Sequence, residues 1–340
     1  MVVSKEYPLV SIVSINFNHS DVTLLMIESL KKCSYKNIEI IIVDNASFND
    51  TPEIITEKYP DVKLVFLPHN LGFGGGNNEG IKLAKGDYIL LLNNDTEVDS
   101  GFLEPMVEVF SNFPNVGMVS PKLLFFNSPN MKKIQYAGAR NISLYTGRGS
   151  NIGWGEIDNG QYDEIYKTDY AHGAALLFSR KVLEIVGCMP DLYFLYYEEH
   201  DWCHVMHTKG MNSYYCGKSK VYHKESVSVG KNSPIMAYFM PRNRIIYLRR
   251  NGNWFNFLFA ILFFLTISTP VAIIRMLKNN EFHLIKHYFS GVFWNLTHLK
   301  SLYGFPKLIN NDAGHIEILL NELEFNKHSM FVKSVLNTEK

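Results

Sequence analysis

Residues 9–17 read LVSIVSINF, and three further apolar runs follow at residues 38–43 (IEIIIV), 62–67 and 88–92 (YILLL). These runs have the length and the β-branched composition of buried strands. The segments between and after them have the apolar spacing of helices, at residues 21–32, 52–58, 77–85 and 101–110. Strands that alternate with helices in this way predict an α/β fold built around a mostly parallel sheet.

Small polar residues follow all four strands. The chain reads Asn-Phe-Asn at 16–18, Asp-Asn-Ala-Ser at 44–47, NLGFGGGNN at 70–78 and Asn-Asn-Asp at 93–95. Because ligands of such sheets bind beyond the carboxyl ends of the strands, these segments predict one continuous ligand crevice. From them we select the following ligand-binding candidates: Asn16, Asp44, Asn70, Gly72, Gly74, Asn77 and Asn94.

The position of the glycine-rich segment excludes two common nucleotide folds. A dinucleotide-binding domain has its glycines after the first strand, whereas here they follow the third, and no Gly-Lys-Ser/Thr triplet follows them as in a phosphate-binding loop. Taken alone, residues 72–76 are typical of a loop that needs positive φ angles. Their place before a helix also allows close approach of the backbone to a phosphate or a sugar.

Seven motifs in the same order resemble those of family 2 glycosyltransferases of the GT-A fold, particularly the rhamnosyltransferase-like branch. Four of them are the strand-end segments VSIVSINFN, IIVDNASFND, NLGFGGGNNEG and LLLNNDTEV. The other three are GAALLFSRKVLEIVGCMPDLYFLYYEEHDWCHV, VYHKESVS and PRNRIIYL. The resemblance covers about residues 8–250 and implies a GT-A fold, a Rossmann-like mixed sheet flanked by helices.

The resemblance implies a divalent metal, Mn²⁺ or Mg²⁺, held by Asp95 and completed by His223. A carboxylate-bound cation would neutralise the diphosphate that leaves during sugar transfer. The family often has a second carboxylate two residues before this Asp, but here that position is Asn93. A loop aspartate that caps the next segment, and a structural histidine, are the alternatives. A zinc-like site at Cys203, His204 and His207 lacks a second ligand pair at suitable spacing.

The resemblance also assigns residues to the nucleoside-diphosphate sugar, a dTDP- or UDP-sugar. The carboxylate of Asp44 would accept the N3–H of uracil or thymine, although an Asp-Asn turn explains it as well. The guanidinium groups of Arg242 and Arg244, in the Arg-Asn-Arg element, suit a diphosphate of the donor or of a lipid carrier. A solvated helix face is the alternative for these two arginines.

The acidic segment Tyr197-Glu198-Glu199-His200-Asp201 is the second centre that the resemblance implies. An inverting transfer needs a carboxylate that takes the proton of the acceptor hydroxyl, and Glu199 stands at the position of that base. The family has Asp there, so Glu198 and Asp201 remain reserve candidates. These acids also suit the first turn of a helix, where they favour its dipole.

Composition and charge divide the chain in two. The 340 residues carry 33 basic and 33 acidic side chains, a balance that argues against a dedicated nucleic-acid binder. Residues 231–340 hold 13 basic and 6 acidic side chains, and residues 1–230 hold 20 and 27. We therefore expect a catalytic domain at 1–230, with a donor half at about 8–120 and an acceptor half at about 121–230, and a helical C-terminal region at 231–340. The four cysteines, in a chain without an evident signal peptide, predict reduced thiols and a cytoplasmic catalytic part.

Residues 251–274 carry no charge, and an uncharged stretch of this length is long enough to span a bilayer. Basic residues then follow at Arg275, Lys278 and Lys286, and their translocation would oppose the positive-inside tendency. We expect helices that dock on the cytoplasmic face of the membrane, with a single span as the alternative.

The resemblance implies an inverting, metal-dependent transferase that adds one sugar, best L-rhamnose from dTDP-rhamnose, to a lipid-linked glycan of a bacterial surface polysaccharide. A UDP-galactose or UDP-glucose donor is an alternative. A processive synthase would carry a Gln-x-x-Arg-Trp motif and several long spans, and neither is evident here. A non-catalytic sugar-nucleotide-binding protein, with Asn93 and Glu199 as marks of a decayed site, is the rival from another class.

Overall fold

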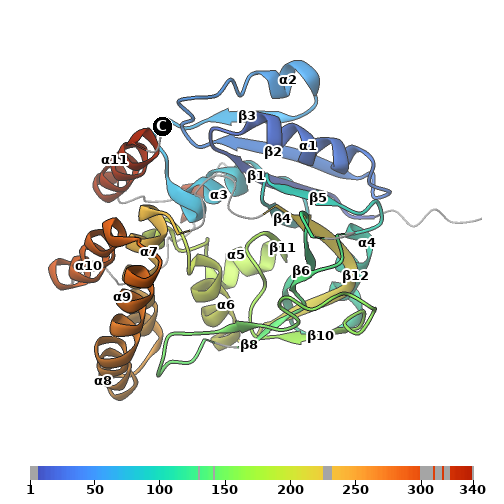
Figure 1. Cartoon of the computed structure of the whole chain (residues 1–340). Helices are drawn as coiled ribbons and strands as arrows, with labels where there is room; N and C mark the ends of the chain where they lie inside the picture. Colours follow the sequence, from blue (N-terminus) through green and yellow to red (C-terminus); the bar gives the residue numbers. More distant parts are fainter. Residues whose placement is uncertain are drawn as a thin grey trace, which may run out of the picture.

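A ten-stranded mixed sheet forms the centre of the computed structural model (Figure 1). The structure describes residues 7–128, 131–140, 142–224 and 232–298, the backbone of 309–310, 316–317 and 322–338, and the side chains of 328–336. The principal strands run in the order β10-β12-β6-β11-β4-β1-β2-β3, while β5 pairs with β12 and β7 with β6. Their bounds are β1 Val10–Asn16, β2 Ile38–Asp44, β3 Lys63–Phe66, β4 Tyr88–Leu92, β5 Thr96–Val98, β6 Val116–Phe125, β7 Ile134–Tyr136, β10 Ile165–Thr168, β11 Ala175–Ser179 and β12 Asn212–His223.

Strand direction divides the sheet into two parts. β1 is parallel to β2 and β4, and β2 is parallel to β3, so the carboxyl ends of these four strands lie at one edge. β11 is antiparallel to both of its neighbours, β4 and β6, and β12 is again parallel to β6. The α/β class and the four N-terminal strands predicted from the sequence are therefore confirmed.

Helices cover both faces of the sheet and connect its strands. Those of the first 223 residues are α1 Ser20–Lys31, α2 Ile54–Lys58, α3 Gly72–Leu83, α4 Leu103–Asn112, α5 Arg180–Val186 and α6 Glu198–Thr208. The short 3₁₀ turn η2 covers Asp191–Tyr193, and two small strands, β8 Ala139–Arg140 and β9 Ser150–Asn151, pair with each other. All four cysteines are buried and free, as expected for reduced thiols.

Helix α3 begins earlier than the sequence predicts. We expect a helix over 77–85 after a glycine loop, whereas α3 already starts at Gly72, the one glycine of residues 72–76 with a positive φ angle (70°). The reason is close packing on the sheet, because a Cβ at Gly76 would lie 3.0 Å from Ile15 Cδ1 and one at Gly80 would lie 2.3 Å from Val13 Cγ1, both on β1. The glycines thus let α3 lie directly on β1.

The C-terminal helices form a separate group on one side of the molecule, away from the β10 edge of the sheet (Figure 1). They are α7 Pro234–Asn251, α8 Trp254–Phe263, α9 Thr269–Lys278, α10 Phe282–Thr297 and α11 Glu322–Thr338, with a π-helical segment, η3 Phe264–Ser268, between α8 and α9. Two short strands, β13 Ile309–Asn310 and β14 Ile316–Glu317, pair before α11. The division of the chain near residue 230 stays a prediction. The two predicted parts are in direct contact, because Asn243 of α7 donates to backbone carbonyls of the loop that precedes α6.

One continuous helical stretch, Trp254–Lys278, is long and apolar enough to cross a membrane, as judged by length and composition alone. Its most apolar 18-residue window has a mean hydropathy of 2.5, and only 17% of that window is buried within the protein. Large apolar side chains are exposed along it and along α10, including Phe255, Leu258, Leu262 and Phe293.

Candidate active site

A cavity of about 1000 Å³ lies at the carboxyl ends of β1, β2 and β4 and extends to α6 and the end of β12. Eight of the residues selected from the sequence line it: Asn70, Gly72, Asn77, Asn94, Asp95, Glu198, Glu199 and His223. Six others do not line it: Asn16, Asp44, Gly74, Asp201, Arg242 and Arg244. The parallel strands therefore bring most strand-end candidates together, as their topology requires.

Asp95 and His223 face each other in this cavity. The Nε2 atom of His223 lies 3.1 Å from Oδ1 of Asp95 because β5 pairs with β12, which places His223 opposite Thr96, the residue after Asp95. On its other side, His223 Nδ1 lies 2.9 Å from Oε1 of the buried Gln135, a residue that sequence reasoning missed. A carboxylate and an imidazole with a fixed ring orientation suit Mn²⁺ or Mg²⁺.

Two protein ligands leave most of the coordination sphere of such an ion to a diphosphate and water. Among the residues that the structure describes, no group of three or more His, Cys, Asp and Glu side chains converges on a metal position. The same finding removes the alternative at Cys203, His204 and His207. The residues thus fit an ion that is held together with its substrate.

Asn16 and Asp44 belong to a polar cluster beside the cavity. Asn16 Nδ2 donates to Asp44 Oδ1 (2.9 Å) and to Asp50 Oδ2 (3.0 Å), and Ser47 donates to both carboxylate oxygens of Asp44. Asp50 in turn accepts bonds from the backbone and side chain of Ser20. Ser47 and Asp50 were not selected from the sequence, although both lie in the motif DNASFND.

The amide of Asn70 organises the start of α3. Its Oδ1 accepts bonds from Asn45 Nδ2 (3.0 Å) and from the backbone N–H of Gly72 (2.8 Å). Gly74 has a different role from the predicted ligand contact, because a Cβ there would lie 3.1 Å from the carbonyl oxygen of Pro190 and 3.4 Å from Cγ of Glu198. The absence of a side chain at Gly74 makes room for the acidic segment.

Glu198 and Glu199 line the cavity from the first turn of α6, and their carboxyl groups differ in charge. Burial and the neighbouring Glu199 raise the pKa of Glu198 well above its ordinary value, and its Oε1 has no hydrogen-bond partner among the described residues. For Glu199, burial acts to raise the pKa, but the imidazoles of His200 and His172 outweigh it and the pKa falls below its ordinary value. Glu199 is therefore the ionised member of the pair.

Asp201 lies on the same helix but is fully buried away from the cavity. Its Oδ2 accepts a bond from Arg250 Nε (2.8 Å) and its Oδ1 from Asn251 Nδ2 (2.6 Å), both at the end of α7. The hypothesis that Asp201 is a reserve base is not supported by this placement, since both of its oxygens are committed to α7.

The loop before α6 has a strained backbone. Phe194, Tyr196 and Tyr197 all have positive φ angles, of 64°, 72° and 78°, which non-glycine residues rarely adopt. Each such residue costs about 1–3 kcal/mol and persists only where its surroundings hold it.

Asn243 and Arg242 of α7 hold this loop. The Nδ2 atom of Asn243 lies within 2.6–3.0 Å of three carbonyl oxygens, those of Tyr193, Leu195 and Tyr196. Arg242 donates to the carbonyls of Leu192 and Tyr193, and its guanidinium stacks on Trp294 of α10. We call these contacts the α7 clamp.

Arg244 donates to the carbonyl of Thr146 and to Ser268 Oγ rather than facing the cavity. Two interpretations from the sequence therefore need correction: that Arg242 and Arg244 are diphosphate ligands, and the alternative that they lie on a solvated helix face. Both side chains are buried against backbone carbonyls and the neighbouring helices because α7 packs between the aromatic loop and the C-terminal helices.

Comparisons with known proteins identify the family of the chain. The chain matches the family described as "Glycosyl transferase family 2" over residues 11–184, just over half of its length. It is 24% identical over 213 residues to a low-salt glycan biosynthesis hexosyltransferase of Haloferax volcanii, a match that covers 61% of this chain and 66% of that protein. It is 22% identical over 250 residues to an N-acetylglucosaminyl-diphospho-decaprenol L-rhamnosyltransferase of Mycobacterium tuberculosis, covering 66% and 80%.

A solved structure described as GalNAc-T7 with UDP, GalNAc and Mn²⁺ has the same fold. It superimposes with a TM-score of 0.61 at 17% sequence identity, over 89% of this chain and 60% of that one. The mixed sheet with a carboxylate and a histidine at its strand ends therefore defines a GT-A glycosyltransferase. The chain belongs to glycosyl transferase family 2.

Proposed function

We propose that the protein transfers a single sugar, with inversion, from a nucleoside-diphosphate donor to a lipid-linked glycan, with the help of Mn²⁺ or Mg²⁺. One observation carries the proposal: the Asp95–His223 pair and the ionised Glu199 line the same cavity. Inversion needs a base on the face of the sugar opposite the leaving diphosphate, and a single cavity with a cation site and a carboxylate base provides both.

The donor would be held along the carboxyl edge of the parallel strands. Asp95 and His223 would bind the cation, which when present supplies positive charge to the leaving diphosphate. Asp44 keeps lone pairs beyond those used by Asn16 and Ser47, so it can accept the N3–H of a uracil or thymine base. Asn70 and the first turn of α3 would lie beside the sugar nucleotide.

Glu199 would take the proton of the acceptor hydroxyl as the new glycosidic bond forms. Its ionised state suits this role, and its environment includes His172, whose ring sequence reasoning missed. The structure shows how close this segment lies to the base: a Cβ at Gly173, the residue after His172, would lie 3.4 Å from the Glu199 carboxyl carbon. Glu198, which keeps its proton, is the poorer base.

The lipid-linked acceptor rests on two observations. The mycobacterial relative is named for an N-acetylglucosaminyl-diphospho-decaprenol acceptor. In addition, α8, η3, α9 and α10 expose apolar side chains beside the basic residues Arg275, Lys278 and Lys286. Such a surface suits docking on an anionic, cytoplasmic membrane face. A single span by residues 254–278 is the alternative arrangement.

L-Rhamnose from dTDP-rhamnose is our preferred donor, and UDP-galactose and UDP-glucose are the alternatives. The test is a panel of dTDP-, UDP- and GDP-sugars with the purified full chain and Mn²⁺, read as thermal stabilisation and as release of nucleoside diphosphate. We expect metal-dependent stabilisation by one donor together with its slow hydrolysis. Stabilisation without any turnover, even with acceptor, would favour a non-catalytic sugar-nucleotide-binding protein instead.

A further inference from the structure

Trp154 is a large exposed aromatic residue at the wall of the cavity. Its side chain is 54% exposed and lines the cavity together with Phe125, Lys133 and Gln135. Its two neighbours, Gly153 and Gly155, both have positive φ angles, of 72° and 81°. Only glycine adopts this conformation without strain, so the backbone presents the indole on a turn of defined shape.

Local contacts fix the indole in place. The backbone N–H of Gly155 donates to the carbonyl of Ile134, and that of Ala137 donates to Ile152, which ties the turn to β7 on both sides. The ring of Phe125 meets the Trp154 ring edge-on, with centroids 5.1 Å apart and an interplanar angle of 85°. An aromatic residue that is exposed but held in this way loses little entropy when a ligand binds.

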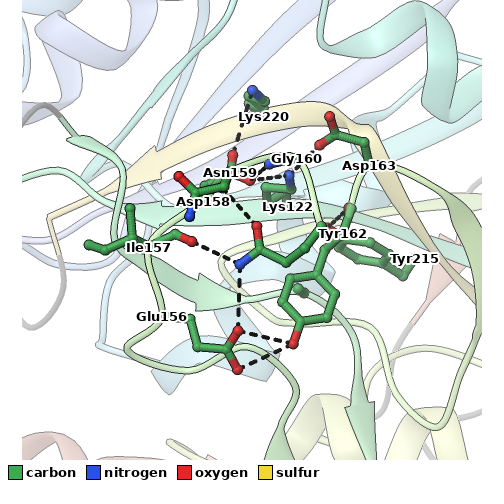
Figure 2. A network of polar contacts seen from close by, with 12 residues as sticks. Lys122, Glu156, Ile157, Asp158, Asn159, Gly160, Tyr162, Asp163, Tyr215 and Lys220 are labelled. Atoms are coloured by element: carbon green, nitrogen blue, oxygen red, sulfur yellow. Dashed lines mark hydrogen bonds and ion pairs between the residues drawn. The ribbon is translucent and has the colours of Figure 1, made fainter.

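The segment that follows the turn is anchored by a polar network around the buried Lys122 (Figure 2). Lys122 of β6 is fully buried and forms ion pairs with Asp158 and Asp163. In the same view, the hydroxyl of Tyr162 reaches the carboxylate of Glu156. The network attaches residues 156–163 to the sheet and so gives Trp154 a rigid base.

We propose that the Trp154 indole is a stacking platform for a pyranose ring, an inference that rests on the proposed function for the cavity itself. The C–H face of a sugar ring is apolar and matches an aromatic face, while ring hydroxyls can reach the exposed Lys133, which lines the same cavity. The ring belongs either to the acceptor glycan or to the donor sugar, and the experiment separates these two sources.

The experiment uses the full chain and saturation-transfer NMR with methyl glycosides of glucose, galactose, rhamnose and N-acetylglucosamine, with UDP as an independent probe of the donor site. At least one glycoside should receive saturation from the wild-type chain and none from Trp154→Ala. Trp154→Phe, which keeps an aromatic face, should retain the signal. Trp254→Ala removes another exposed tryptophan (66% exposed), which lies outside the cavity, and this variant should retain the signal too.

Steady-state kinetics identify the source of the ring. In Trp154→Ala, the KM for the acceptor should rise about tenfold with the donor KM unchanged if the ring belongs to the acceptor, and the reverse if it belongs to the donor sugar. Unchanged signals and KM values in Trp154→Ala, or a wild-type chain that binds no glycoside of the panel, would overturn the proposal. A wild-type chain that binds glycosides through Trp154 but not UDP would instead contradict the proposed nucleotide-sugar function alone.

Discussion

Asp95 and Asp201 are both buried aspartates, but the regions around them are organised differently. At the strand ends, Asp95 lines the cavity and faces a histidine that also lines it. Between α6 and α7, both carboxylate oxygens of Asp201 accept bonds from Arg250 and Asn251. Burial alone therefore does not distinguish a reactive carboxylate from a structural one, whereas the partners do.

The α6–α7 region nevertheless bears on the chemistry of the cavity. It holds a loop with three left-handed aromatic residues directly before Glu198 and Glu199. The strand-end region thus supplies Asp95, the proposed cation ligand, and the α6–α7 region carries and positions Glu199, the proposed base. Variants in the two regions should separate these contributions.

The largest expected effect is on transfer by Asp95→Asn. Loss of the carboxylate should lower kcat by roughly 10³-fold, because the leaving diphosphate loses its cation, with the melting temperature nearly unchanged. Asp201→Asn, the matched substitution in the other region, should instead lower the free energy of unfolding by about 3 kcal/mol, because it leaves Arg250 buried without its charge partner. Equal loss of activity and of stability in both variants would abolish the distinction between the two aspartates.

Glu199→Gln should follow in size, with a fall in kcat of roughly 10²-fold or more and little change in donor affinity, because the amide cannot accept the hydroxyl proton. Glu198→Gln is the control. Since burial raises the pKa of Glu198 well above its ordinary value and so favours the protonated carboxyl, a neutral amide there should change kcat only slightly. If, in single-turnover assays, Glu198→Gln strongly lowers the rate of transfer and Glu199→Gln changes it only slightly, the base is Glu198.

Asn243→Ala removes the amide of the α7 clamp. We expect a fall in kcat of about tenfold with an unchanged donor KM, because the loop relaxes and Glu199 is displaced. The double variant Asn243→Ala, Tyr196→Gly should regain activity, since glycine adopts the positive φ angle without strain. Protection of the loop from proteolysis reports its order without a donor. If Asn243 has a purely structural role, Asn243→Ala should lower stability, and glycine at position 196 should restore neither kcat nor this protection.

The pH profile of kcat tests the charge of Glu199. A base is active when deprotonated, so a lowered pKa keeps activity constant down to pH values below 4.5, the ordinary value, and places the acidic limb beneath it. His200→Gln removes an imidazole that lowers this pKa and should move the limb to higher pH. Circular dichroism at each pH separates loss of base function from unfolding. An acidic limb near pH 6 in the wild-type chain would contradict the assignment.

The smallest effect concerns membrane binding. If α8–α10 dock on the membrane, reversal of Arg275, Lys278 and Lys286 to Glu should release the chain from anionic vesicles, since each basic residue near the surface contributes about 1 kcal/mol. Reversal of three exposed lysines elsewhere, Lys63, Lys181 and Lys209, is the control. Binding that resists both this change and high salt would indicate a span, whose anchorage comes from some twenty apolar residues.

The sequence predicted the strand-end part of the site well because chain topology alone decides it. In a parallel sheet the carboxyl ends meet at one edge, so Asn70 and Asp95 both belong to that edge and line the cavity, whereas Asn16 and Asp44 from the same edge do not line it. The glycine-rich segment was placed correctly, but its helical state was not predicted, because the close packing of Gly74 on Pro190 and of Gly76 on Ile15 is a tertiary contact.

The helical part could not be predicted in the same way. The direction in which Arg242 or Asp201 points depends on which helices pack against it, and no periodicity in the sequence identifies the partner helix. Gln135 and Trp154 were missed for a related reason. Both lie in a segment with weak local signals, and only the pairing of β6 and β7 brings that segment to the cavity.

The bonds from Arg250 and Asn251 to Asp201 have a practical consequence for shortening the chain. Asn251 is three residues before Trp254, where the exposed apolar helices begin. A version trimmed for solubility at the apparent composition boundary near residue 230 would lose the α7 clamp and both partners of Asp201. Trimming that respects the architecture would stop after α7, and even then Arg242 would lose the Trp294 ring on which it stacks, so the exposed apolar helices and the loop beside the cavity share one folding unit.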